Sequence, residues 1–171
     1  PTELLALKYR SKKQKLREFT SLHILVVSLR CDHSCPYCQV SRRSEDKARF
    51  DMSPEIVEKA IELIFRSPSK AIKVEFQGGE PLLNFELIKK VVLECEIKAT
   101  NDSRDLEFVI ATTLSLLTND VLDFCEQHNI LLSTSLDGPE ELHNKNRPRP
   151  GRDSYERYVS GLAKARDKLG R

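Results

Sequence analysis

Short apolar runs alternate with longer stretches of helical spacing along most of the chain. Runs rich in Ile, Val, Leu and Phe predict strands at residues 23–29, 71–77, 106–112 and 130–136. After each run, apolar residues recur every three or four positions and predict helices that begin near residues 53, 84, 118 and 153. The order strand–helix is repeated, which indicates an α/β fold.

The second predicted strand has a two-faced pattern, in which apolar residues alternate with Lys73, Glu75 and Gln77. Consecutive strand–helix units have right-handed crossovers, which make the strands parallel and place the helices on one side. Such a series of units is half of a (β/α)8 barrel. The polar face of the second strand is then expected to point into the barrel lumen.

The composition is that of an ordinary globular domain. The chain has 171 residues, of which 39% are hydrophobic and 32% charged, enough for one core. A net charge of +2 gives no general case for nucleic acid, and no apolar stretch is long enough to span a membrane. A basic segment, Lys8–Arg17, is expected to be a solvated, partly helical leader; a grip on an acidic peptide is the alternative.

Three of the five cysteines lie close together in the sequence CDHSCPYC, from Cys31 to Cys38. They follow directly on the first predicted strand, and Pro36 favours a turn there. The thiols are therefore expected to converge at the C-terminal end of that strand. This pattern does not indicate a disulfide framework, and free thiols require a reducing compartment, which predicts a cytoplasmic protein.

Three interpretations of the cysteine turn remain open from the residues alone. The first is a [4Fe–4S] cluster, whose fourth iron has no protein ligand and can bind another molecule. The second is zinc, with His33 or a distant residue as the fourth ligand, in a binding module without catalysis. The third is a group of thiols that binds nothing.

Further candidate residues follow the predicted strands at the same end, where parallel α/β folds bind ligands. Gly78 and Gly79 lack a Cβ and let the backbone approach a ligand closely. Glu80 can accept hydrogen bonds from a cationic amine. The remaining candidates carry donors or acceptors suited to a carboxylate or to ribose hydroxyls: Gln77, Ser135 and, as an additional candidate, Arg147.

Three motifs together resemble the signature of the radical S-adenosylmethionine (SAM) superfamily. They are the cysteine motif with Tyr37 before its last cysteine, GGEP at residues 78–81, and SLDGPEELHNKNRP at residues 135–148. The last is similar to the peptide-modifying branch, which includes anaerobic sulfatase-maturating enzymes, and the combination resembles the His-Xaa-Ser system radical SAM maturase.

The resemblance implies a partial (β/α)6 barrel, with about four βα units in residues 21–171 after a leader in residues 1–20. The remaining βα units, and any domain with auxiliary clusters, are then expected beyond Arg171. On this resemblance Cys31, Cys35 and Cys38 hold a [4Fe–4S] cluster, and SAM binds its fourth iron.

The resemblance also implies contacts to SAM. Gln77 and Ser135 contact SAM, and Tyr37 lies near its adenine. At the end of the third strand, relatives commonly have Asn or Gly, whereas this chain has Thr112-Thr113. The resemblance therefore assigns no contact to these two threonines.

The implied activity is reductive cleavage of SAM to methionine and a 5′-deoxyadenosyl radical, which removes a hydrogen atom from the substrate. The expected substrate is a peptide or protein, and the expected electron donor is a flavodoxin or ferredoxin. A small molecule or an RNA base is the alternative substrate. Apart from the leader, basic residues are interleaved with acidic ones, which does not favour RNA. No residue of the chain is assigned to the substrate chemistry.

Overall fold

The four predicted strands form one parallel sheet in the order β1-β2-β3-β4. The structure, a computed structural model, describes residues 2–14, 16, 20–40, 42–43 and 46–170. The strands are β1 (Leu22–Ser28), β2 (Ala71–Gly78), β3 (Asp105–Ala111) and β4 (Leu131–Ser133). The helices are α1 (Thr2–Lys13), α2 (Lys47–Phe50), α3 (Pro54–Phe65), α4 (Phe85–Asp102), α5 (Asn119–Gln127), α6 (Glu140–Asn146) and α7 (Ser154–Leu169), with a 3₁₀ helix at Pro81–Asn84.

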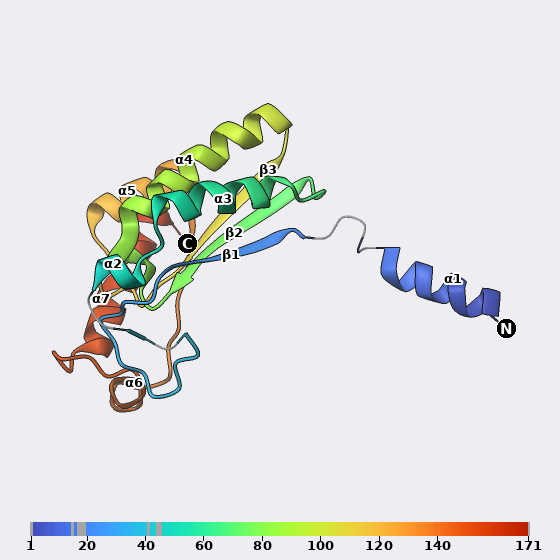
Figure 1. Ribbon diagram of the computed structural model, residues 1–171. Helices are drawn as coiled ribbons and strands as arrows, with labels where there is room; N and C mark the ends of the chain where they lie inside the picture. Colours follow the sequence, from blue (N-terminus) through green and yellow to red (C-terminus); the bar gives the residue numbers. More distant parts are fainter. Residues whose placement is uncertain (1, 15, 17–19, 41, 44–45, 171) are drawn as a thin grey trace.

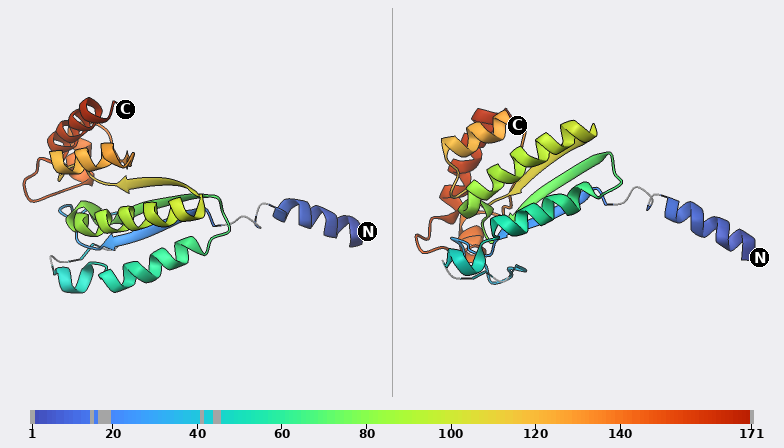
Figure 2. Two further views of the ribbon diagram at one scale, coloured as in Figure 1. Left: turned by 90° about the horizontal axis from the view of Figure 1, so that it is seen from above. Right: turned by 45° about the horizontal axis from the view of Figure 1, so that its top comes forward.

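Residue alternation decides which face of the sheet is buried. Leu25, Phe76 and Ile110 are in register across the first three strands and are at most 7% exposed. Helices α3, α4 and α5 lie on this side of the sheet (Figure 1, Figure 2) and contribute apolar residues such as Ile61 and Ile88 to the same core. The apolar positions of the sheet and the helix stripes therefore form one hydrophobic layer.

The opposite face of the sheet is more polar and more exposed. Ile24 and Val26 of β1 are 50% and 38% exposed, and Glu75 of β2 is in register with Ile24. Gln77 lies on the same face and donates a hydrogen bond from Nε2 to Glu75 Oε1 (2.6 Å). The two-faced pattern predicted for the second strand is confirmed, and the sheet has the one-sided architecture of a partial (β/α) barrel.

The largest departure from the predicted elements follows the fourth strand. β4 ends at Ser133, three residues before the predicted end, because it pairs with β3 over a short register that finishes at Ala111. The segment expected to be a charged loop then forms α6. Pro139 and the acids of its first turn favour a helix there, and its His143 is 2% exposed because it packs beside Tyr158 of α7.

The helices begin near the predicted residues, but most of those residues do not cap the helix with their side chains. Thr118 accepts a hydrogen bond from the backbone N–H of Val121 and caps α5. Asn84 precedes α4 but donates from Nδ2 to the Val27 carbonyl oxygen (2.9 Å). Asp153 precedes α7 without a side-chain cap, because its carboxylate pairs with Arg149 and Arg157. Of the four predicted helix starts, Ser53, Asn84 and Asp153 make no side-chain cap.

The basic leader is helical over Thr2–Lys13, and none of the residues of α1 is buried. Lys15 and Arg17, which belong to the predicted basic segment, lie outside the described residues. Within the described part of the chain, no helix combines the length and the apolar character needed to cross a bilayer.

Candidate functional site

The cysteine turn starts where β1 ends. Cys31 is 9% exposed, Cys35 and Cys38 are half-buried, and the Cys38 N–H donates to the Cys35 carbonyl oxygen (3.2 Å). Directly before the turn, Arg30 is 3% exposed and donates from Nε and from a terminal nitrogen to the two carboxylate oxygens of Asp51, both at 2.7 Å. The base of the turn is thereby attached to the segment that leads into α3.

The three thiols are soft ligands, which suit a zinc ion or an iron–sulfur cluster. Sulfur ligands of one tetrahedral zinc lie about 3.8 Å apart. Among the described residues, the side chains whose ligand atoms all lie within 4.8 Å of one another are Cys31, Asp32 and His33, and the three cysteines are not such a group. A [4Fe–4S] cluster is bound by cysteine thiolates, and three of them leave one iron open. The donor set of the cysteine turn, three thiols in eight residues, therefore fits a [4Fe–4S] cluster.

His33, which the zinc interpretation named as one of two possible kinds of fourth ligand, is buried and already hydrogen-bonded. Its side chain is 2% exposed, its Nδ1 lies 2.8 Å from Asp32 Oδ1, and its Nε2 lies 2.9 Å from Ser154 Oγ. Both ring nitrogens thus have protein partners. Burial also raises the pKa of the Cys31 thiol to about 12, so metal binding at this turn must displace a proton.

The glycine pair after β2 lies against the cysteine turn. The Gly79 N–H donates to the Ser28 carbonyl oxygen and the Glu80 N–H donates to the Arg30 carbonyl oxygen, both at 2.8 Å. A Cβ on Gly78 would overlap the Ser28 carbonyl oxygen. A Cβ on Gly79 would overlap the Arg30 carbonyl oxygen and lie 2.9 Å from Cys31 Cβ. The absent side chains therefore let one strand end pack on the other.

Glu80 has a different position from the one expected. Its side chain is fully buried, and its carboxylate accepts hydrogen bonds from the N–H groups of Leu82 and Thr113 and from the hydroxyls of Thr112 and Thr113. Burial raises the pKa of this carboxyl group, and the hydrogen bonds oppose that rise. A ligand's amine would therefore have to compete with these contacts for the Glu80 carboxylate. The contacts connect the ends of β2 and β3.

Tyr37 and Arg147 meet at Asp137, in the segment after β4. The Tyr37 hydroxyl and Arg147 Nε (2.7 Å) donate to the two carboxylate oxygens of Asp137, and the Arg147 guanidinium lies 5.7 Å from the centre of the Tyr37 ring. Burial and the hydrogen bond to Asp137 raise the pKa of Tyr37 to about 12. Burial alone would raise the pKa of Asp137, but the bonds from Tyr37 and Arg147 outweigh it and lower that pKa.

The two remaining predicted residues are Gln77 and Ser135. Gln77 is the last residue but one of β2 and is half-buried, with its amide donating to Glu75. Ser135 follows β4 and is exposed. The predicted residues therefore come from the ends of β1, β2 and β4, and Cys31 and Gly79 are in direct proximity.

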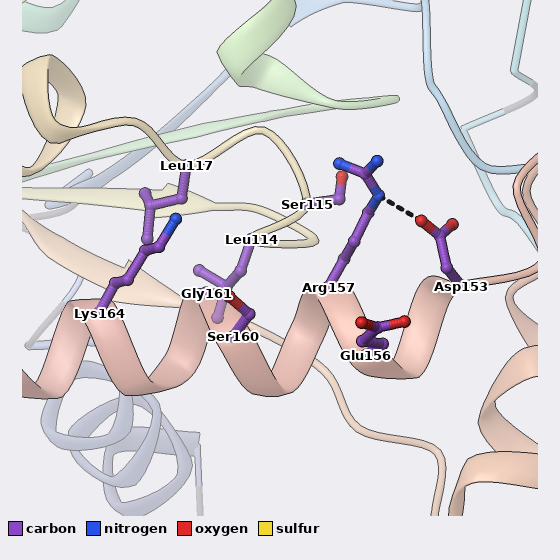
Figure 3. A pocket seen from close by; sticks show the side chains of 9 residues that line it. All are labelled: Leu114, Ser115, Leu117, Asp153, Glu156, Arg157, Ser160, Gly161 and Lys164. Carbon is purple, nitrogen blue, oxygen red and sulfur yellow. Dashed lines mark hydrogen bonds and ion pairs between the residues drawn. The ribbon is translucent and has the colours of Figure 1, made fainter.

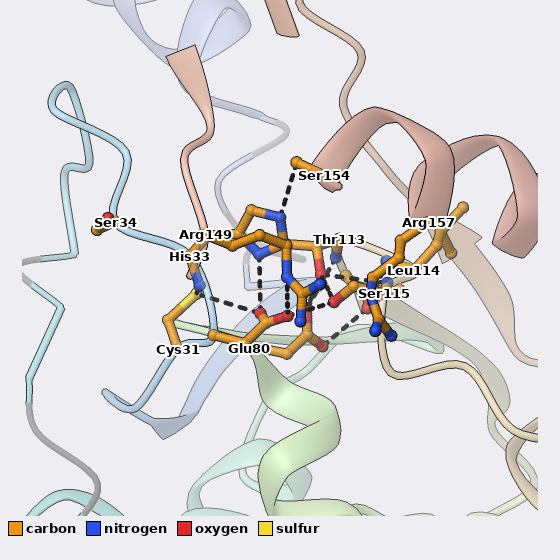
Figure 4. Close-up of polar contacts among 12 residues, drawn as sticks. Cys31, His33, Ser34, Glu80, Thr113, Leu114, Ser115, Arg149, Ser154 and Arg157 are labelled. Atoms are coloured by element: carbon orange, nitrogen blue, oxygen red, sulfur yellow. Dashed lines mark hydrogen bonds and ion pairs between the residues drawn. The ribbon is translucent and has the colours of Figure 1, made fainter. Parts of the chain in front are cut away.

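A network of polar side chains behind the cysteine turn (Figure 4) had no signal in the sequence. We call it the Asp32 network. Asp32 accepts a hydrogen bond from Ser115 Oγ (2.5 Å) and lies 3.5 Å from Arg149 Nε. Its members are Asp32, His33, Ser115, Arg149 and Ser154. Only the fold brings these residues together, because they come from three distant segments.

A cavity of about 210 Å³ opens next to this network, between the loop after β3 and α7 (Figure 3). Its polar lining includes both signs of charge, with Arg157 donating from Nε to Asp153 Oδ2 (2.7 Å). None of the predicted site residues lines it. It is separate from the place where the cysteines and glycines meet.

A one-sided parallel sheet, with a cysteine turn after the first strand and a glycine pair after the second, places the chain among α/β-barrel proteins with a cysteine-ligated site at the barrel mouth. The model of the Radical SAM superfamily matches residues 25–170. The chain belongs to the radical SAM superfamily. This membership implies a [4Fe–4S] cluster and SAM as its cofactors.

Curated relatives and solved structures agree with this family. The radical SAM cyclopropyl synthase TigE of Paramaledivibacter caminithermalis is 28% identical over 81% of this chain and 31% of its own length. The serine-type anaerobic sulfatase-maturating enzyme of Bacteroides thetaiotaomicron is 27% identical over 82% of this chain and 36% of its own length. Histidine-tagged anSMEcpe with bound AdoMet (SAM) superposes with a TM-score of 0.73 at 26% identity, covering 87% of this chain and 39% of that one. The chain thus spans about a third of these proteins.

Proposed function

We propose that the protein is a radical SAM enzyme that modifies a peptide or protein. The observation that carries the proposal is the contact between the cysteine turn and the glycine pair, where Cys31 and Gly79 are side by side at the mouth of the sheet. If the three cysteines held a cluster and the glycine-rich strand end bound SAM, the two would have to be neighbours, as Cys31 and Gly79 are. The zinc module is disfavoured by the partners of His33.

When bound, the cluster and SAM supply one-electron cleavage of the SAM carbon–sulfur bond, which gives methionine and a 5′-deoxyadenosyl radical. This chain's residues have positioning tasks. Cys31, Cys35 and Cys38 would hold the cluster. The backbone after β2 would offer carbonyl oxygens to the SAM amine, and Glu80 fixes the path of that backbone through its contacts with the threonines that follow β3.

Other groups at the mouth are suited to orient SAM. Gln77, near the end of β2, and the exposed Ser135, which follows β4, provide hydrogen-bonding groups. Tyr37 presents a 51% exposed ring, which suits stacking near the adenine. Arg147 acts with Asp137 as a support for that ring.

A peptide or protein substrate is supported by the relatives. Two kinds of sulfatase-maturating enzyme align with the chain at 27 to 28% identity, and native anSMEcpe with bound AdoMet and Kp18Cys peptide superposes with a TM-score of 0.72 at 26% identity. We further propose a flavodoxin or ferredoxin as the electron donor, a cytoplasmic location, and a division into a leader (1–20) and barrel residues (21–171).

Anaerobic reconstitution of the full-length protein with iron and sulfide tests the activity. Substituting Cys31→Ala should remove about four irons per chain and abolish reductant-dependent formation of 5′-deoxyadenosine. The matched control is Cys95→Ala, because Cys95 is also buried but lies in the core on α4. Stoichiometric zinc, with no cluster after reconstitution, would refute the proposal.

The substrate class is tested with a peptide encoded beside the gene. The co-expressed peptide should change in mass, and deuterium placed at the modified position should appear in 5′-deoxyadenosine. Turnover of SAM with unchanged peptides, but with deuterium transfer from a small molecule or an RNA base, would contradict the peptide assignment.

A further inference from the structure

Every residue between the first two cysteines is attached to a different part of the fold. Asp32 accepts from Ser115, which follows β3. His33 Nε2 lies 2.9 Å from Ser154 Oγ, at the first residue of α7. The Ser34 N–H donates to the Pro148 carbonyl oxygen (2.8 Å). The short connection from Cys31 to Cys35 therefore has three separate attachment points.

These attachment points are themselves fixed. Ser115 Oγ lies 2.8 Å from Thr113 Oγ1, and Thr113 donates to the buried carboxylate of Glu80. A continuous hydrogen-bonded path therefore leads from the cysteine turn through Ser115 and Thr113 to Glu80, after the end of β2 (Figure 4).

The loop after β3 and α7 are also packed closely on each other. Leu114 has a left-handed backbone (φ 64°), and Gly161 of α7 lies so near that a Cβ there would be 2.7 Å from Leu114 Cβ. Figure 3 shows the two residues side by side at the wall of the cavity. Ser115 and Ser154 thus belong to segments that cannot shift independently.

We infer that Asp32, His33 and Ser34 are positioning residues that hold Cys31 and Cys35 in place before any metal binds, with Ser115 and Ser154 as their fixed points. The inference rests on the proposed function, since it takes these cysteines as cluster ligands. A turn ordered in advance loses less conformational entropy when the cluster binds, and contacts behind ligands commonly orient them.

The arrangement Asp32–His33–Ser154 has the hydrogen-bond order of a hydrolase triad, but burial decides against that role. Ser154 is 1% exposed and His33 is 2% exposed, so no substrate carbonyl can reach the hydroxyl. The bonds of this trio connect α7 to the cysteine turn, which is a positioning task.

Hydrogen exchange of the reduced, metal-free, full-length protein tests the inference directly. In Ser154→Ala, amide exchange in the peptide that contains residues 31–38 should be about two- to tenfold faster than in wild type, the effect of losing one buried hydrogen bond. The matched control is Ser160→Ala, an exposed serine on the same helix. It should leave exchange at the turn unchanged. Equal exchange rates in the turn of Ser154→Ala and of wild type would overturn the inference.

Ser115→Ala provides a second, independent variant if Ser154→Ala does not fold, as judged by circular dichroism. It should accelerate exchange in the same peptide. In reconstituted protein, both variants should release iron to a chelator faster and change the electron paramagnetic resonance line shape of the reduced cluster. Wild-type exchange, iron release and line shape in Ser115→Ala would also overturn it. The exchange measurement needs no iron, so its result is independent of whether the protein is a radical SAM enzyme.

Discussion

Glutamate side chains at the two ends of the sheet have opposite environments, one buried and one exposed. At the C-terminal ends of the strands, Glu80 is fully buried and accepts hydrogen bonds from three residues. Near the N-terminal ends, Glu107 of β3 pairs with Lys73 of β2, and both side chains are more than 40% exposed. The carboxylate near the cysteines and glycines is thus part of a buried hydrogen-bonded contact, whereas the carboxylate near the other end belongs to a solvated ion pair.

The largest difference between the two ends is expected when each of the two carboxylates is removed in turn. Glu80→Ala leaves the buried N–H groups of Leu82 and Thr113 without acceptors, so the free energy of unfolding should fall by about 3 kcal/mol. Glu107→Ala loses only an exposed ion pair and should cost less than about 1 kcal/mol. Denaturant titration of both variants measures the difference. Equal losses would show that the two ends are energetically alike.

A smaller effect is expected at the glycine pair. In Gly79→Ala the new Cβ meets the Arg30 carbonyl oxygen and Cys31 Cβ. The backbone fixes the positions of both atoms, so no side-chain rotation can move them away. The free energy of unfolding should fall by about 1 to 3 kcal/mol, and the iron content after reconstitution should fall with it. Gly170→Ala is the control, because no atom lies within 4 Å of its added Cβ, although its φ of 65° adds some strain. Full iron loading of Gly79→Ala would contradict the packing argument.

The smallest effect depends on pH and concerns His143 of α6. Burial lowers its pKa, nearby Arg147 lowers it further, and Asp137 opposes both. The folded protein therefore disfavours protonation, and stability should fall as pH drops below the unfolded value near 6.5, by at most about 1.4 kcal/mol per pH unit. The loss should level off once pH is below the lowered folded pKa.

Melting temperatures of wild type and His143→Gln between pH 7.5 and about 5 test this effect. The variant should lose part of the pH dependence, because the neutral ring that accepts from the Asp137 N–H (3.4 Å) is gone. His128→Gln, whose ring pairs with Glu96 instead, should retain the dependence from His143. A wild-type slope in His143→Gln would contradict the assignment.

Local periodicity was sufficient for most of the fold. The ends of the first three strands lie within one or two residues of the predicted ends. These strands were recognisable because their apolar residues recur at the positions that face the core. The fourth strand was predicted too long and α6 was missed. Both depend on partners distant in sequence: β4 is as long as its pairing with β3 allows, and α6 is stabilised where His143 packs on α7.

The same distinction applies to the site. Cysteine spacing and the glycine pair are short motifs, so the sequence alone identified them. The Asp32 network could not be predicted, because Ser115 lies 83 residues from Asp32 and Ser154 lies 121 residues from His33. The burial of Glu80 was missed for a similar reason: its acceptor role is defined by the threonines after β3.

Arg30 joins two crossovers of the barrel. Its guanidinium binds Asp51, on the way from β1 to α3, and also donates to the Leu83 carbonyl oxygen (2.7 Å), on the way from β2 to α4. Lysine cannot replace it, since a single ammonium group lacks the planar fork that grips a carboxylate and a carbonyl together. Across descendants of this gene, positions 30 and 51 should therefore mutate as a pair, and a library randomised at either one alone should return the parental amino acid.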